Sequence, residues 1–307
     1  MPESNFTKTL IVIVGPTAIG KTALAIDIAK HYNTEIVSAD SRQFYKEMEI
    51  GTAKPDAKEL ADAKHHFINS HSVSQLFSTG DFEFEALKVI DSIFENHDIA
   101  IMVGGSGLYI NAVVNGLDEM PEIDLEIRSK LNRQFEDEGL EVIQNQLRQY
   151  DPEYFEKVDT NNPQRMIRGL EVFLSTGQKL SSMLSSTKKQ RSFNIIKLGL
   201  NTDRAKLYDR INLRVDKMMQ NGLLDEVKSL AEHKNYNALN TVGYSEIFDY
   251  LDGNVTLEIA VASIKQNTRR FAKRQLTWFR RDDEVKWFEP DQNERIIELI
   301  DAELTKH

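Results

Sequence analysis

The 307 residues suffice for one large α/β domain or for a domain that carries an insertion. Apolar residues make up 40% of the chain and charged residues 28%, and no apolar run reaches the length of a membrane helix. The first residues, MPESNFTK, do not follow a signal-peptide pattern, so we expect a cytoplasmic protein without a membrane partner. The absence of cysteine excludes disulfides and thiolate zinc sites. A net charge of −10 does not favour nucleic-acid binding, although a local basic stretch could still support it.

A phosphate-binding loop is the clearest local signal in the sequence. The apolar run at residues 10–14 predicts a buried parallel strand, and GPTAIGKT follows it directly at residues 15–22. This octapeptide matches G-x-x-x-x-G-K-[ST], in which a curled backbone points its N–H groups at phosphate oxygens. Lys21 adds a positive charge, the Thr22 hydroxyl can ligate a metal such as Mg²⁺, and a helix beginning there directs its positive end at the anion. The residues expected to bind a diphosphate or triphosphate are Gly15, Pro16, Thr17, Ala18, Ile19, Gly20, Lys21 and Thr22.

Strands and helices alternate through the first part of the chain. Further strands are predicted at residues 35–39, 65–68, 99–103 and 195–200, with a helix at residues 81–94. Such alternation is typical of a parallel sheet flanked by helices, so we predict an α/β fold with a P-loop NTPase-like core. Ligands gather at the carboxyl ends of such strands, which should bring residues 40–43 close to the phosphate loop. The glycines in residues 104–107 could permit close approach of a ligand or simply form a tight turn.

The middle of the chain is predicted to be an all-helical insertion domain at residues 118–192. It contains no buried strand; helices are predicted at residues 128–135, 140–147 and 163–174, and a flexible connection at residues 181–192. The catalytic core would then comprise residues 1–117 and 193–307. Its C-terminal part is expected to be helical at residues 203–220, 223–233 and 257–279.

Asp40 is the first candidate for a chemical role. An acidic residue at a strand end of a phosphate-loop protein can hold the metal or act as a general base. Asp-Ser at such a turn can equally cap a following helix. The strand at residues 99–103 ends in glycines, so the acidic residue that usually helps to hold the metal is missing there. The residues by themselves leave both interpretations of Asp40 open.

Arg210 and Arg214 are candidates for binding the diphosphate. They are four residues apart on a predicted helix, so both project from one face. Guanidinium groups bind phosphate oxygens through two hydrogen bonds, which suits a clamp. A solvated face that pairs with acidic residues is the commoner arrangement, and it remains the alternative.

A basic stretch, TRRFAKRQLTWFRR at residues 268–281, could line a nucleic-acid backbone. It contains six basic residues and no acidic one. Arg165 and Arg168 in the insertion could form an opposite basic wall. The aromatic residues of the stretch are expected to lie in the core rather than to stack on bases: Phe271, Trp278 and Phe279.

Together these motifs resemble one family, the tRNA dimethylallyltransferases, also called tRNA isopentenyltransferases. The resemblance covers nearly the whole chain in GPTAIGKT (15–22), SADSRQFY (38–45), IGTAKP (50–55), VGGSGLY (103–109), NPQRMIRGLEVF (162–173), DRINLRVDKM (209–218), VGYSEIFDYL (242–251) and RRFAKRQLTWFR (269–280). It implies transfer of a prenyl group from dimethylallyl diphosphate to N6 of adenosine 37 in tRNA. It also implies a monomer of bacterial type, in which a channel between core and insertion receives the tRNA anticodon stem-loop.

The resemblance also implies roles for individual residues. Asp40 would accept the proton of the adenine amine, while Lys21, Thr22 with Mg²⁺, and Arg214 would stabilise the leaving diphosphate. The residues implied to contact tRNA are Asp40, Ser41, Arg42, Gln43, Ser106, Arg128, Gln164, Arg165, Met166, Ile167 and Arg168.

Three other functions remain open at this stage. A small-molecule P-loop kinase would use ATP but would leave the basic stretch at residues 268–281 unexplained. An isopentenyltransferase acting on free adenylate would have less need for the insertion. A non-enzymatic, nucleotide-gated RNA-binding protein would require Asp40 to be only a helix cap.

Overall fold

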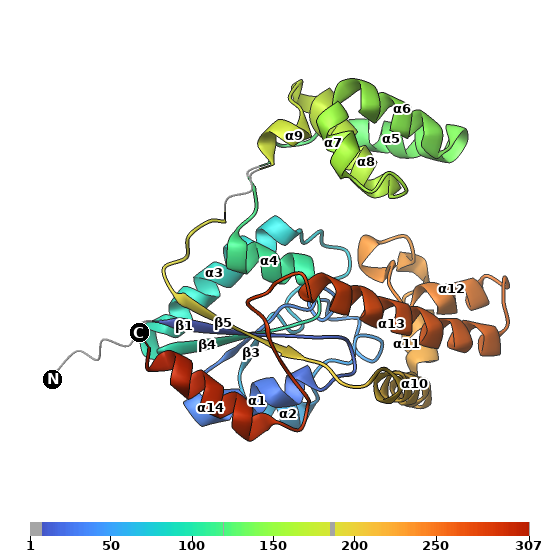
Figure 1. The fold of residues 1–307 in the computed structure, drawn as a ribbon. Helices are drawn as coiled ribbons and strands as arrows, with labels where there is room; N and C mark the ends of the chain where they lie inside the picture. The colour runs from blue at the N-terminus through green and yellow to red at the C-terminus, as the bar shows by residue number, and fades with distance from the viewer. Residues whose placement is uncertain (1–7, 119, 185–187, 307) are drawn as a thin grey trace. The chain divides into compact units, whose positions relative to one another are not determined.

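The computed structural model describes residues 8–118, 120–184 and 188–306, which belong to two compact units (Figure 1). We call Met1–Asn115 with Gln190–His307 the core unit, and Gly116–Lys189 the helical unit. Within the described ranges, no helix combines the length and the apolar character that a membrane span requires. Each unit is described by itself below.

A parallel sheet organises the core unit. In the part of the chain that the structure describes it has six strands: β1 (Thr9–Val14), β2 (Ile36–Ser38), β3 (His65–His66), β4 (Ile99–Val103), β5 (Asn194–Leu200) and β6 (Lys286–Phe288). Their spatial order is β3-β2-β4-β1-β5-β6, with Ile11 of β1 opposite Ile101 of β4 and Ile196 of β5. Every residue of β1 is buried, as expected for a strand covered on both faces. The predicted parallel α/β sheet is confirmed, and β6 is a strand that the sequence did not indicate.

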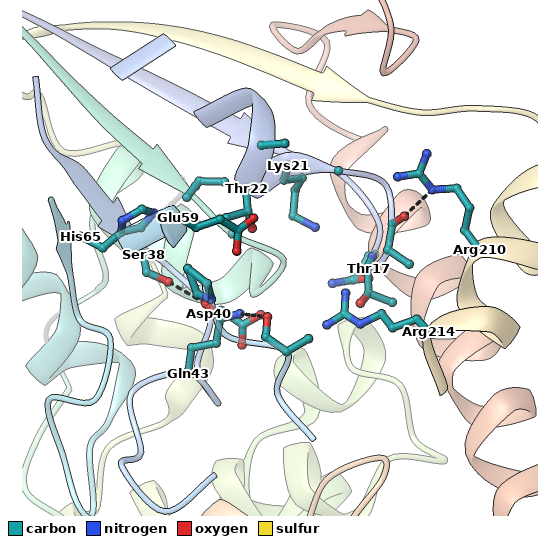
Figure 2. A pocket seen from close by; sticks show the side chains of 18 of the residues that line it. Thr17, Lys21, Thr22, Ser38, Asp40, Gln43, Glu59, His65, Arg210 and Arg214 are labelled. Carbon is teal, nitrogen blue, oxygen red and sulfur yellow. Dashed lines mark hydrogen bonds between the residues drawn. The ribbon is translucent and has the colours of Figure 1, made fainter. Parts of the chain in front are cut away.

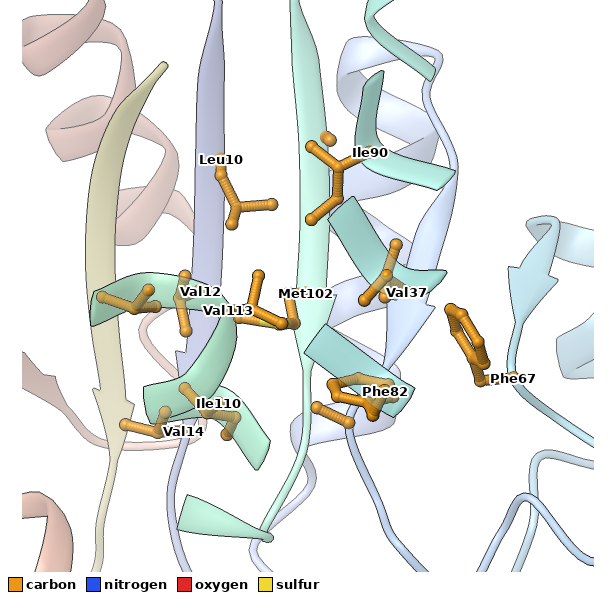
Figure 3. Close-up of a cluster of buried hydrophobic side chains, with 14 of the residues drawn as sticks. Leu10, Val12, Val14, Val37, Phe67, Phe82, Ile90, Met102, Ile110 and Val113 are labelled. Atoms are coloured by element: carbon orange, nitrogen blue, oxygen red, sulfur yellow. The ribbon is translucent and has the colours of Figure 1, made fainter. Parts of the chain in front are cut away.

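Helices cover both faces of the sheet. Leu10 and Val12 of β1 point to the face covered by α3 (Thr79–Asn96) and α4 (Gly107–Asn115), and Figure 3 shows this cluster. The alternate residues of β1 join a second cluster on the opposite face, because successive side chains of a strand point to opposite sides. This second face is covered by α1 (Lys21–Tyr32), α10 (Arg204–Gln220) and α14 (Asn293–Leu304).

The rest of the core unit is mainly helical, and its longest helix, α13 (Leu257–Phe279), packs against all three apolar clusters of the unit. This helix contributes Phe279 to the first cluster, Ala272 to the second and Ile264 to a third cluster around Tyr244. Its bounds are those predicted, whereas the helix expected at residues 223–233 is broken into α11 and a short 3₁₀ turn. The remaining elements of the unit are α2 (Ala57–Asp62), α11 (Leu223–Ser229), η1 (Ala231–His233), η2 (Asn237–Leu239) and α12 (Ser245–Leu251).

The helical unit has an apolar core of its own. It comprises α5 (Leu125–Glu138), α6 (Leu140–Tyr150), α7 (Pro152–Lys157), α8 (Pro163–Thr176) and α9 (Leu180–Met183). Leu131 of α5, Ile143 and Leu147 of α6, and Leu170 of α8 are buried against one another. Pro163 begins α8, where its missing N–H costs no hydrogen bond, and the Asn162 side chain accepts from the Arg165 backbone N–H.

The boundary after the helical unit lies earlier than the sequence suggested. The compact unit spans residues 116–189, whereas the insertion was expected at residues 118–192. Arg191 explains the difference, because its guanidinium donates to the carbonyls of Ala112 and Val113 and pairs with Glu83, all in the core unit. Within the connection expected to be flexible, α9 forms a short helix, and residues 185–187 lie outside the described residues.

Candidate active site

The phosphate loop connects β1 to α1 at the carboxyl edge of the sheet. Its curl depends on two glycines with positive φ: Gly15 at 147° and Gly20 at 105°, the latter immediately before the first turn of α1. Gly15 also leaves no room for a side chain, because a Cβ there would lie 2.6 Å from the Leu200 carbonyl oxygen. The loop is therefore held against the end of β5 by backbone contact.

A cavity of about 280 Å³ lies beside this loop (Figure 2). Five residues of the loop line the cavity: Thr17, Ala18, Gly20, Lys21 and Thr22. The other three loop residues shape the site without lining it. Gly15 packs on β5, the Ile19 side chain is fully buried, and Pro16 has no N–H to offer an anion. That Gly15, Pro16 and Ile19 also bind the ligand stays a prediction, and for Gly15 and Ile19 the contact would be made by the backbone N–H groups.

Lys21 extends along the loop into the cavity. Its ammonium donates a hydrogen bond of 2.8 Å to the Pro16 carbonyl oxygen. Burial lowers the pKa of Lys21 to about 8; the Asp40 carboxylate acts in the opposite direction, and the Arg214 charge adds to the lowering. Burial removes water from the ammonium, and the negative charge of a bound diphosphate would compensate for that loss.

Arg210 and Arg214 face the cavity from α10, across from Lys21 (Figure 2). Arg210 Nε donates to the Ala18 carbonyl oxygen at 2.8 Å, which ties α10 to the loop. Burial lowers the pKa of Arg214, and the Asp40 carboxylate opposes that effect. Both guanidinium groups thus line the cavity, which is the placement that a diphosphate clamp requires, and the clamp itself stays a prediction.

Asp40 lies two residues after the end of β2, immediately before the turn at residues 41–44. Its Oδ1 accepts a hydrogen bond of 3.1 Å from the Arg42 backbone N–H, and its side chain lines the cavity. The helix-cap interpretation is wrong, because turns rather than a helix follow at residues 41–44. The carboxylate therefore keeps an oxygen available for chemistry while the other is fixed by the backbone.

A second, larger cavity of about 550 Å³ adjoins the first. Five residues line both cavities and mark the place where they meet: Thr17, Asp40, Arg214, Phe271 and Gln275. Ser41, Arg42 and Ser106, all implied to contact tRNA, line the second cavity. Gln43 lines the first, and its Nε2 donates to the Thr52 and Ala53 carbonyl oxygens.

The exposed aromatic face of α13 corrects the expectation for the basic stretch. Phe279 is buried as expected, but Phe271 and Trp278 are 38% and 37% exposed and line the second cavity. Periodicity placed them on one face of the helix without showing whether that face meets the core or a cavity. Both rings are therefore available to contact a ligand.

Two functional residues escaped sequence reasoning. Gln275, between Arg274 and Leu276 in the basic stretch, is 6% exposed and bonds both to the phosphate loop and to Gly105. Glu226 of α11 accepts the backbone N–H groups of residues 49–51 and the Tyr244 hydroxyl. Gln275 lies within the motif RRFAKRQLTWFR (269–280), but the basic residues of that motif suggested only phosphate contacts, and Glu226 lies outside every motif. Both residues act through contacts with distant parts of the chain, which local spacing does not reveal.

The residues of the helical unit implied to bind tRNA fall into two groups. Gln164 and Arg165 are exposed on α8. Met166 and Ile167 are buried in the core of the unit, so the expectation that their side chains contact tRNA is corrected. A run of consecutive helical residues spans more than one face, and a ligand meets only one of them.

Arg128 and Arg168 have a partner within the helical unit. Glu171 of α8 is fully buried and accepts two hydrogen bonds from Arg128, at 2.5 and 2.7 Å, and one from Arg168 at 2.6 Å. The hydrogen bond to Glu171 raises the pKa of Arg128. The two guanidinium groups thus compensate the buried charge of Glu171. Both side chains are also partly exposed to solvent.

A divalent cation fits the donors of the first cavity. Thr22 supplies a hydroxyl and Asp40 and Glu59 supply carboxylates, the oxygen ligands that Mg²⁺ prefers. Among the described residues, no group of three metal-ligating His, Cys, Asp or Glu side chains exists. An Mg²⁺ ion here would therefore need phosphate oxygens and water to complete its shell, which is its usual manner of binding.

Comparison with known proteins agrees with these features. The IPP transferase family model matches residues 43–282. The tRNA dimethylallyltransferase of Christiangramia forsetii is 53% identical over 296 residues, which is 96% of this chain and 98% of that protein. The tRNA dimethylallyltransferase of Flavobacterium johnsoniae is 51% identical over 96% of this chain and 98% of its own length.

Solved structures show the same likeness. The tRNA isopentenylpyrophosphate transferase of Bacillus halodurans has a TM-score of 0.73 at 38% identity, with 97% of each chain covered. A eukaryotic dimethylallyltransferase acting on tRNA has a TM-score of 0.78 at 28% identity, covering 92% of this chain and 74% of that one. With a phosphate loop on a parallel sheet and these likenesses along nearly its full length, the chain belongs to the IPP transferase family.

Proposed function

We propose that this protein transfers a dimethylallyl group from dimethylallyl diphosphate to N6 of adenosine 37 in tRNA and releases diphosphate. Membership of the IPP transferase family and the names of its relatives support the reaction class. The observation that carries the proposal is the meeting of two cavities at Asp40. One is lined by cations and a phosphate loop, and the other by aromatic and polar side chains suited to a nucleobase.

The first cavity would hold and activate the leaving group. Lys21, Arg210 and Arg214 surround the space beside the phosphate loop and can stabilise the negative charge that grows on the diphosphate. Asp40 and Glu59 on the same walls would repel a diphosphate by itself, which favours a divalent cation between them. Thr22 and these carboxylates, the latter directly or through water, would hold Mg²⁺. When bound, Mg²⁺ would neutralise part of the diphosphate charge.

Asp40 would act as the general base at the meeting point. As the bond between N6 of adenine and C1 of the prenyl group forms, the bond between C1 and the diphosphate oxygen breaks. The electron pair of that bond leaves with the diphosphate, and the N6 proton moves to the Asp40 carboxylate. The Arg42 N–H group that binds Asp40 Oδ1 keeps the carboxylate oriented toward the cavity.

The tRNA would be bound by residues from both units. Ser41, Arg42 and Ser106 line the second cavity, where an adenine withdrawn from the anticodon loop would lie. Arg128, Gln164, Arg165 and Arg168 of the helical unit would contact the phosphate backbone of the anticodon stem-loop. We further propose that the enzyme is monomeric and cytoplasmic.

The other candidate functions fit less well. A small-molecule kinase has no use for a cavity of about 550 Å³ lined by Phe271 and Trp278 beside the phosphate site. A transferase acting on free adenylate would not need the helical unit with its separate core. An RNA-binding protein without catalysis required Asp40 to be a helix cap, and no helix follows it.

The test is incubation of the protein with Mg²⁺, unmodified tRNA and dimethylallyl diphosphate, followed by nucleoside mass analysis. We expect a prenyl group on adenosine in tRNA and none on free AMP. Phosphate release from ATP without a prenyl product would instead support a kinase. Asp40→Asn should lower kcat by about 10²- to 10⁴-fold while tRNA affinity changes by less than about threefold. The control is Asp225→Asn, an 85% exposed carboxylate of α11, which should behave as wild type.

A further inference from the structure

Gln275 of α13 joins two backbone segments that face each other across the site. Its Oε1 accepts a hydrogen bond of 2.9 Å from the Thr17 N–H in the phosphate loop. Its Nε2 donates a hydrogen bond of 2.9 Å to the Gly105 carbonyl oxygen, in the turn that follows β4. The side chain is 6% exposed and lines both cavities, so it lies where they meet.

Only a primary amide of this length fits both partners. Thr17 offers a donor and Gly105 an acceptor, so the side chain must present an acceptor to one and a donor to the other. A Cβ at Gly105 would lie 2.2 Å from Gln275 Nε2, so a side chain there would displace the amide from its hydrogen bond. The glycine of the turn and the glutamine of the helix therefore depend on each other.

The turn that Gln275 holds is connected to Asp40 by further hydrogen bonds. Ser106 follows Gly105, and its Oγ accepts from the Ser41 N–H at 3.0 Å and donates to the Ser41 Oγ at 3.1 Å. Ser41 is the neighbour of Asp40. A continuous series of contacts thus runs from the phosphate loop through Gln275 and Ser106 to the segment that carries the carboxylate.

We propose that Gln275 is a positioning residue that sets the separation between the phosphate loop and Asp40. The inference rests on the proposed function, in which the loop holds the leaving group and Asp40 removes the proton. The separation of these two groups decides whether bond formation and proton removal can occur together, and an error of about 1 Å can cost about 100-fold in rate. Gln275 acts through Thr17 and Ser106 and does not itself take part in the reaction.

Two variants of Gln275 separate its two hydrogen bonds. Gln275→Met keeps the length and removes both bonds. Gln275→Glu keeps an oxygen for the Thr17 N–H but presents a second oxygen to the Gly105 carbonyl, so only the bond to Gly105 is lost. Gln266→Met, at an exposed glutamine of the same helix, is the matched control.

The first measurement is steady-state kinetics with tRNA and dimethylallyl diphosphate. We expect Gln275→Met to lower kcat by about 10- to 100-fold, with KM for both substrates within about threefold of wild type. A residue that only binds substrate would instead raise KM at unchanged kcat, and that result would overturn the proposal. The control variant should have the kinetics of the wild type.

The second measurement is amide hydrogen exchange, which does not depend on activity. In Gln275→Met the amides of both Thr17 and Ser41 should exchange at least about tenfold faster. In Gln275→Glu only the Ser41 amide should do so. If Ser41 keeps its protection in both variants, the connection to Asp40 does not exist and the inference fails. If the wild type forms no prenyl product, the proposed function fails, while the Ser41 exchange still decides the role of Gln275.

Discussion

Replacing Glu226 by glutamine should release the loop that forms one wall of both cavities. The carboxylate accepts four hydrogen bonds: from the N–H groups of Glu49 at 3.1 Å, Ile50 at 2.7 Å and Gly51 at 3.0 Å, and from the Tyr244 hydroxyl at 2.6 Å. Each oxygen accepts two of them. The segment that they hold continues into Gly51 and Thr52, which line the second cavity, and Ala53 and Pro55, which line the first.

The expected cost of Glu226→Gln follows from this count. The amide keeps one oxygen, which can accept from the Glu49 and Ile50 N–H groups, and its NH₂ group can donate to the Tyr244 hydroxyl, so the Gly51 N–H loses its partner and the other three bonds lose their charge. Hydrogen bonds to a charged group contribute about 1.5–3 kcal/mol each. At the lower value, taken because Glu226 is only half-buried, the lost Gly51 bond accounts for about 1.5 kcal/mol. The other three bonds weaken by about 0.5 kcal/mol each as they become neutral, so we expect a loss of about 3 kcal/mol in the free energy of unfolding.

Urea denaturation followed by tryptophan fluorescence measures this loss. Both tryptophans of the chain, Trp278 and Trp287, lie in the core unit, so the signal reports the unfolding of that unit. Tyr244→Phe is the control, because it removes one of the four bonds and should cost only about 1.5 kcal/mol. If Glu226→Gln costs no more than the control, the backbone hydrogen bonds do not hold the loop and the reasoning is refuted.

Three further outcomes can be checked directly. Glu171→Ala should destabilise the helical unit by about 2 kcal/mol, because the partly exposed Arg128 and Arg168 lose their shared partner. Thermal unfolding followed by circular dichroism measures this loss, and an unchanged melting curve would contradict it. Burial lowers the pKa of Lys21 to about 8, so the ammonium loses its charge above that pH. Diphosphate affinity measured by calorimetry should therefore fall by up to about tenfold per pH unit above about pH 8. An affinity that stays constant to about pH 9.5 would exclude a charged Lys21 as a diphosphate ligand. Gly51→Ala should lower the melting temperature, because its Cβ would lie 2.5 Å from the Tyr244 ring, whereas Gly80→Ala, whose Cβ would meet its nearest atom only at 3.7 Å, should not.

Local and topological rules account for what the sequence predicted correctly. The apolar run of β1 and the phosphate loop lie within a few residues, where periodicity and spacing carry the information. The position of Asp40 beside the loop follows from the rule that the carboxyl ends of parallel strands meet at one edge of the sheet. The rule requires no knowledge of side-chain contacts, and the structure brings Asp40 and Lys21 to one cavity.

Contacts between distant parts of the chain account for what was missed. Gln275 lies 258 residues from Thr17, and Glu226 lies 175 residues from Gly51, so neither contact leaves a trace in local spacing. Apolar periodicity predicts a core position for Phe271 and Trp278, because it marks a face of the helix without identifying what covers that face. Met166 and Ile167 were included with their neighbours in a motif, although the helix turns their side chains inward.

The order of strands in the sheet has a consequence for synthesis of the protein. β1 pairs with β4 on one side and with β5 on the other, and β5 lies beyond the entire helical unit in the chain. While a ribosome is still translating residues 116–189, the nascent core therefore exposes an unpaired edge of β1, an apolar template for aggregation. The helical unit is continuous and has its own core, so it can fold as it emerges. A chain arrested before β5 should therefore need a chaperone to stay soluble, although it already contains the phosphate loop.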